Sequence, residues 1–163
     1  MPLVPDWAPN IHPLLVHFPI ALLVTSVALD VAAYALQGKG RLLLRHVGAV
    51  LCVVGALAAL ATYVTGRTAS QTVLIPGMAQ GLVKDHWEWA FWTLCWFGGL
   101  AVVQVVLFLT GRTSDGKTSP PTAAALVLAG VVGLALLFKT GDLGGRLVYE
   151  QGVGVGVLPG APR

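Results

Sequence analysis

The sequence predicts an all-α protein: a bundle of four transmembrane helices followed by a tail on the outer face of the membrane. Two observations predict it. The composition is 56% hydrophobic and only 10% charged, with a mean hydropathy of +0.79, which is far above that of soluble domains. The charges lie mainly between long apolar runs, because a charge at the bilayer centre costs roughly 2.5–3.5 kcal/mol or more. The 163 residues leave room for a single membrane domain.

Four apolar runs are long enough to cross a hydrocarbon core about 30 Å thick, which requires roughly 20 helical residues. They are residues 14–36, 42–64, 88–110 and 122–139. Each run is apolar on every face, whereas the strands of an outer-membrane barrel alternate between apolar and polar residues. We expect residues 140–163 to form an extramembrane tail, because Gly141, Gly144 and Gly145 can end the fourth helix.

The first apolar run is predicted to be a retained helix. Residues 1–10 contain Asp6 but no Lys or Arg, so the basic region of a cleaved signal peptide is missing. Pro13 suits a first helical turn, whereas Pro19 removes a backbone hydrogen bond and should bend the helix. We expect that bend to turn His17 toward the bundle interior.

The second and fourth runs carry small residues at intervals of three and four, which places them on one helical face. They are Gly48, Cys52, Gly55, Ala59, Thr62 and Gly66 in the second run, and Ala125, Ala129 and Gly133 in the fourth. In lipid, helices associate through small residues that let their backbones approach. These faces therefore predict packing and carry no signal for chemistry.

The third run begins with a cluster of tryptophans, Trp87, Trp89 and Trp92, and Trp96 follows one turn later. Tryptophan favours the headgroup level, so the cluster is interpreted as an anchor at the outer interface. A stacking wall for a planar cofactor is the alternative.

The distribution of basic residues predicts the orientation. With four spans, the two sides of the membrane carry five bases each, so the count alone does not decide. Lys39, Arg41 and Arg45 crowd the first hairpin, whereas residues 1–16 hold no base. This predicts a multi-pass protein of the cell inner (cytoplasmic) membrane with both termini outside. No basic stripe with interleaved aromatics is present, so we expect no nucleic-acid partner.

Asp30 is the only acidic residue well inside a predicted span. Intramembrane charges generally pair with one another, and Arg45 on the neighbouring helix is long enough to reach a carboxylate there. A structural ion pair is therefore the preferred interpretation, with a proton relay as the alternative.

Three of the four histidines lie near the outer end, and they predict a cofactor site. His17 and His86 stand on different helices at similar depth, and imidazole is a usual axial ligand of haem iron. We expect these two to hold a b-type haem, with His12 either replacing one of them or binding a propionate. Arg67 in the adjacent loop would supply a cation for the propionates. The protein would then be an electron-transfer subunit.

Two other functions remain open. His12, His17 and His86 could bind zinc or copper directly, since three imidazoles suit these metals. The chain could also be a non-catalytic membrane scaffold, a subunit of a homo- or hetero-oligomer. No CxxCH, HExxH, GxSxG, GxGxxG or Walker motif occurs, so we expect an electron-transfer or binding subunit rather than an enzyme.

Two segments carry a family resemblance: NIHPLLVHFPIAL at residues 10–22 and GDLGGRLVYEQGVGV at residues 141–155. They resemble the opening and closing motifs of the bacterial membrane proteins called domain of unknown function 2231. The resemblance implies four helices and an unknown role. Because some members are joined to Rieske-type domains, it also implies electron transfer with a haem or quinone and with redox protein partners.

The tail after the fourth run can be interpreted in two ways. It would fold back over the outer mouth of the bundle, where Tyr149 would donate a hydrogen bond to a bound cofactor. The alternative is a plain cap at the membrane interface.

Overall fold

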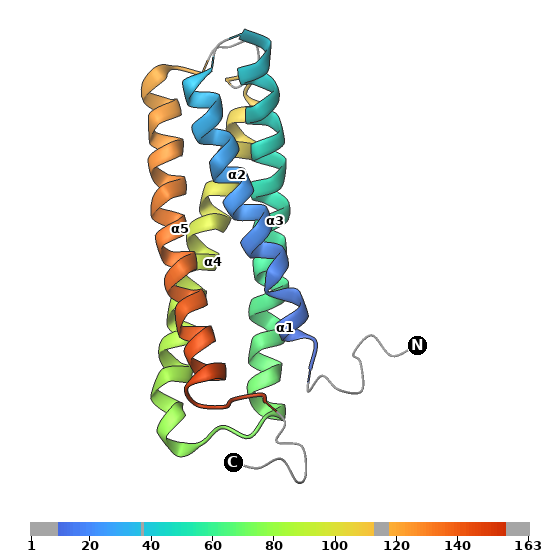
Figure 1. The fold of residues 1–163 in the computed structure, drawn as a ribbon. Helices are drawn as coiled ribbons and strands as arrows, with labels where there is room; N and C mark the ends of the chain where they lie inside the picture. The colour runs from blue at the N-terminus through green and yellow to red at the C-terminus, as the bar shows by residue number, and fades with distance from the viewer. Residues whose placement is uncertain (1–9, 37, 113–117, 156–163) are drawn as a thin grey trace.

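In the computed structural model, which describes residues 10–36, 38–112 and 118–155, the chain is a bundle of long helices (Figure 1). The elements are α1 (His12–Leu15), α2 (His17–Ala35), α3 (Gly38–Thr72), the 3-10 helix η1 (Gly77–Ala79), α4 (Gln80–Leu109) and α5 (Pro120–Tyr149). Taking α1 and α2 together, four helices in the described ranges are long and apolar enough to cross a membrane. The predicted all-α membrane fold is confirmed, and no strand occurs among these residues.

The helices run up and down in sequence order around the bundle. Each packs against the next along the chain, and α5 also packs against α2, so α2 and α4 stand at diagonal positions. Both described chain ends and the connection from α3 to α4 lie at one end of the bundle (Figure 1). We call it the terminal end, and the opposite end, where α2 meets α3 and α4 meets α5, the loop end.

The core is apolar, and so is much of the outer surface. The buried core residues are Leu23, Val27, Cys52, Ala56, Phe97, Leu100, Ala101, Leu126 and Leu137. Large apolar side chains such as Leu43, Leu57 and Leu128 are more than 60% exposed on the outside. A soluble protein rarely exposes apolar surface of this extent, so these side chains face lipid.

The glycine faces make the packing close, as predicted. A Cβ added at Gly55 would lie 2.7 Å from Leu23 Cδ2, and one at Gly133 would lie 2.7 Å from Phe97 Cζ. Any larger residue at these two contacts would force the facing side chain to shift. Ala125 of the predicted face on the fourth helix is exposed, so only part of that face packs against another helix.

The fourth helix is longer than predicted. Instead of ending near residue 139, α5 continues to Tyr149, so residues 140–149 are helical rather than tail. Leu143 and Leu147 are buried in this extension, and packing of that kind outweighs the weak helix propensity of glycine. Gly152, with φ +65°, follows the helix end, because a left-handed backbone there suits glycine. Residues 156–163 of the predicted tail lie outside the described residues.

Candidate functional site

His12 turns inward from the start of α1 and rests on α3. The Asn10 side chain accepts the His12 N–H at 3.1 Å, which fixes the first turn. The imidazole Nδ1 lies 3.1 Å from the carbonyl oxygen of Thr62. A carbonyl can only accept, so Nδ1 carries the proton and Nε2 keeps a free lone pair. A Cβ at Gly66 would lie 2.9 Å from His12 Cε1, so glycine is what allows the ring to sit there.

Pro19 explains the entry angle of this segment. Its ring nitrogen has no proton to give to the Leu15 carbonyl, and α1 and α2 are separated at Val16. The Leu15 carbonyl instead accepts from Thr62 Oγ1 at 3.4 Å. Thr62 therefore contacts the segment twice, with its hydroxyl at Leu15 and its carbonyl at His12.

His86 makes the same arrangement on the second hairpin. It lies near the start of α4, and its Nδ1 is 3.1 Å from the carbonyl oxygen of Thr140 on α5. A Cβ at Gly144 would lie 3.1 Å from His86 Cε1. The Thr140 hydroxyl is 2.9 Å from the hydroxyl of Thr93, which connects α5 to α4 about two turns after His86.

The two histidines are equivalent in the two halves of the bundle. Each stands on the first helix of a hairpin, donates to the carbonyl of a threonine on the second helix, and packs against the glycine four residues later. Both hairpins begin at the terminal end, so an approximate twofold axis along the bundle relates them (Figure 1).

The Nε2 atoms of this pair are available to a ligand. Within the described part of the chain neither accepts a hydrogen bond, and neither is among the fully buried nitrogen atoms that lack a partner. Each imidazole is fixed through Nδ1 and keeps the lone pair of Nε2, the nitrogen through which a neutral imidazole can bind a metal.

His17 is the predicted site residue that the structure places elsewhere. It is exposed on the outside of α2, so the prediction that the Pro19 bend turns it inward is wrong. The reason is helical geometry: five residues rotate a side chain by about 140°, so His12 and His17 cannot both face the interior. The described residues contain no group of three or more His, Cys, Asp or Glu side chains placed to hold a metal ion.

The other residues singled out in the sequence lie at several different places in the bundle. Arg67 places its guanidinium carbon 5.3 Å from the centre of the Trp87 ring, a cation–π contact between α3 and α4 at the terminal end. Tyr149 is 90% exposed at the end of α5 and does not cover the bundle. Trp92 faces outward, while Trp96 donates from Nε1 to the Ala129 carbonyl at 2.8 Å, so neither contacts the histidines.

The spacing that marks the site was present in the sequence. Thr62 and Gly66 repeat as Thr140 and Gly144, each pair about fifty residues after a histidine in the first two turns of a helix. Glycine four residues after threonine lies on the same helical face. Sequence reasoning missed this repeat because it treated the glycines as packing or helix-ending residues only.

The fold and this site define a four-helix integral membrane protein with two inward imidazoles near one end. A family model described as "Predicted membrane protein (DUF2231)" matches residues 8–157, so the chain belongs to this family of unknown function. The resemblance carried by its opening and closing segments is thereby confirmed. No curated protein and no solved structure matches the chain.

Proposed function

We propose that the protein is a membrane electron-transfer subunit that holds one haem b between His12 and His86. The observation that carries the proposal is the pair of imidazoles on diagonal helices, each donating from Nδ1 to a backbone carbonyl. Histidine ligands of metals characteristically have the second ring nitrogen engaged in this way, because the bond fixes the tautomer and the ring orientation. His12 takes the place first expected for His17.

Two glycines and one arginine beside the imidazoles support the proposal. Gly66 and Gly144 let each ring lie against its supporting helix, so the rings are held from behind. Arg67 follows Gly66 directly and would supply a cation for a propionate near the terminal end. Haem, when bound, would supply one-electron chemistry, and His12 and His86 would hold and orient it.

The alternatives have less support. Structural zinc almost always takes four ligands and catalytic zinc three from the protein, whereas two inward imidazoles are found here and no group of three metal-binding side chains occurs in the described ranges. A scaffold would explain the packing faces but not the matched imidazole, threonine and glycine sets. Redox proteins or a quinone would be the electron-transfer partners. Lys39, Arg41 and Arg45 near the loop end favour both termini outside the cytoplasmic membrane.

The proposal is tested by expressing the full chain with haem available and recording the absorption spectrum of the purified protein after reduction. We expect one haem per chain in the wild type and loss of haem, or of its low-spin spectrum, in His12→Ala and His86→Ala. His17→Ala is the matched control and should keep the wild-type spectrum. A wild-type protein without haem, or equal loss in the His17 variant, would overturn the proposal.

A further inference from the structure

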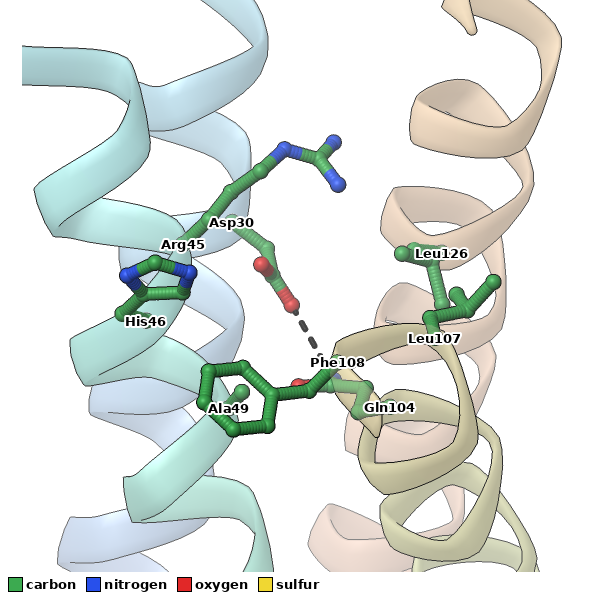
Figure 2. A pocket seen from close by; sticks show the side chains of 8 residues that line it. All are labelled: Asp30, Arg45, His46, Ala49, Gln104, Leu107, Phe108 and Leu126. Carbon is green, nitrogen blue, oxygen red and sulfur yellow. Dashed lines mark hydrogen bonds between the residues drawn. The ribbon is translucent and has the colours of Figure 1, made fainter. Parts of the chain in front are cut away.

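A second polar cluster lies inside the loop-end half of the bundle, away from the histidine pair. Asp30 from α2, Arg45 and His46 from α3, and Gln104 from α4 line one cavity (Figure 2). Asp30, Arg45 and Gln104 are each only 4–5% exposed. Polar residues this deeply buried in a membrane bundle are expensive and commonly mark pathways for ions or protons.

The expected ion pair between Asp30 and Arg45 is not formed. Ion pairs within 4.0 Å among the described residues join only exposed surface side chains. The Asp30 carboxylate accepts a hydrogen bond from Gln104 Nε2 at 3.3 Å. The Arg45 guanidinium points away from this carboxylate (Figure 2). Arg45 Nε and Nη2, together with His46 Nε2, are buried and have no hydrogen-bond partner in the described part of the chain.

The cavity is matched to one small polar molecule. The centre of a water molecule has about 20 Å³ to occupy there, and about 10–15 Å³ is enough for one water that has two to four polar partners. Arg45, His46 and Asp30 offer such partners on different sides of the cavity. A buried charged donor left unpartnered is costly, so a water at this position stabilises the cluster.

We propose that this cavity is a proton-transfer site built round one internal water that connects the Asp30 carboxyl with the His46 imidazole. In the transfer step the Asp30 O–H bond breaks, the water passes one proton on, and an N–H bond forms at His46 Nε2. The products are a carboxylate and an imidazolium, and no further reactant is required.

The charged neighbour of Asp30 acts on both products of this step. Arg45 on α3 favours the carboxylate that the step produces and opposes the imidazolium at His46. Arg41 acts on Arg45. Gln104 of α4 also faces Asp30, and α5 contributes only the apolar Leu126 to the cavity. The ring of His46 packs edge-on against Phe108, with 5.5 Å between centroids, which keeps it beside the cavity.

The test uses infrared difference spectra of the full chain in lipid nanodiscs, recorded between acidic and alkaline pH. We expect a titrating carboxylic C=O band that is absent in Asp30→Asn. After transfer into D₂O, this group should exchange its proton at least tenfold more slowly in Ala49→Leu, because the added side chain fills the cavity. Ala58→Leu changes another half-buried alanine of α3 that does not line the cavity, and it should exchange at the wild-type rate.

Two results would overturn the proposal. One is a wild type without any Asp30-dependent carboxylic band, which would identify a permanently ionised carboxylate. The other is exchange at the wild-type rate in Ala49→Leu. If that variant does not fold, Leu107→Phe fills the cavity from α4 instead, and it should slow the exchange in the same way. Neither the infrared band nor the exchange rate depends on haem. A negative result here therefore leaves the proposed function untouched, and a protein without haem leaves this proposal untouched.

Discussion

Two glycines determine how closely each imidazole approaches its supporting helix. A Cβ at Gly66 or Gly144 would lie 2.9 Å or 3.1 Å from the Cε1 atom of the facing histidine, too near for the ring to remain in place. We expect Gly66→Ala and Gly144→Ala to displace the ring and convert part of the haem from low to high spin. Overpacking of this kind typically costs about 1–3 kcal/mol of stability.

The visible spectrum of the ferric protein and a thermal melt measure both effects. Gly145→Ala is the control, since a Cβ there meets nothing within 4 Å. Unchanged spectra in all three variants would mean that the glycines do not position the rings.

At the same scale, the sequence indicated the residue types of the proposed site but not that His12, rather than His17, contacts the interior of the bundle. His12 and His17 share one helical segment, and the expected bend at Pro19 was taken to decide which one faces inward. The deciding features were the carbonyl of Thr62 and the space at Gly66, which act across fifty residues. A contact of that range is set by tertiary packing, so no local pattern in the first helix could identify it.

At the scale of the element, Pro19 and Thr62 together shape the entry of the first helix. Replacing Pro19 by Ala restores a donor for the Leu15 carbonyl, which then no longer needs the Thr62 hydroxyl. We expect α1 and α2 to become one straighter helix and His12 to shift from its carbonyl partner. Loss of one such hydrogen bond, worth about 0.5–1.5 kcal/mol, corresponds to a roughly two- to tenfold weaker haem affinity.

Haem titration of the apoprotein measures this change. Pro13→Ala alters only the first helical turn, where a donor is not required, and should bind as the wild type does. Equal affinity in the two variants would contradict the role given to the bend.

The extent of the helices was only partly predictable. The four apolar runs located the membrane-crossing segments, but α5 passes through Gly141, Gly144 and Gly145 to end at Tyr149. The predicted fourth span ended at Lys139 because a charged residue usually marks the end of a transmembrane run. In the structure the helix continues, and Lys139 and Asp142 form an ion pair at 3.3 Å on its surface. Glycine in a membrane helix served close packing, as at Gly144 against His86, rather than termination.

At the scale of the whole molecule, the two similar hairpins place a different polar cluster at each end of the bundle. The terminal end carries the matched imidazoles, and the loop end carries the buried cluster of Asp30, Arg45, His46 and Gln104. Composition predicted the membrane class, and the positions of the apolar runs predicted the number of spans. It could not predict the symmetry of the hairpins, because that depends on which side chains meet across helices.

The most direct test of the histidine site replaces one ligand by another that iron also accepts. In His12→Met and His86→Met we expect haem to be retained with a raised midpoint potential and the spectrum of His/Met ligation, because thioether sulfur in place of imidazole raises the potential. His17→Met should leave the potential and spectrum at their wild-type values. Wild-type values in His12→Met and His86→Met, with haem still bound, would show that the iron is held elsewhere and would contradict the account.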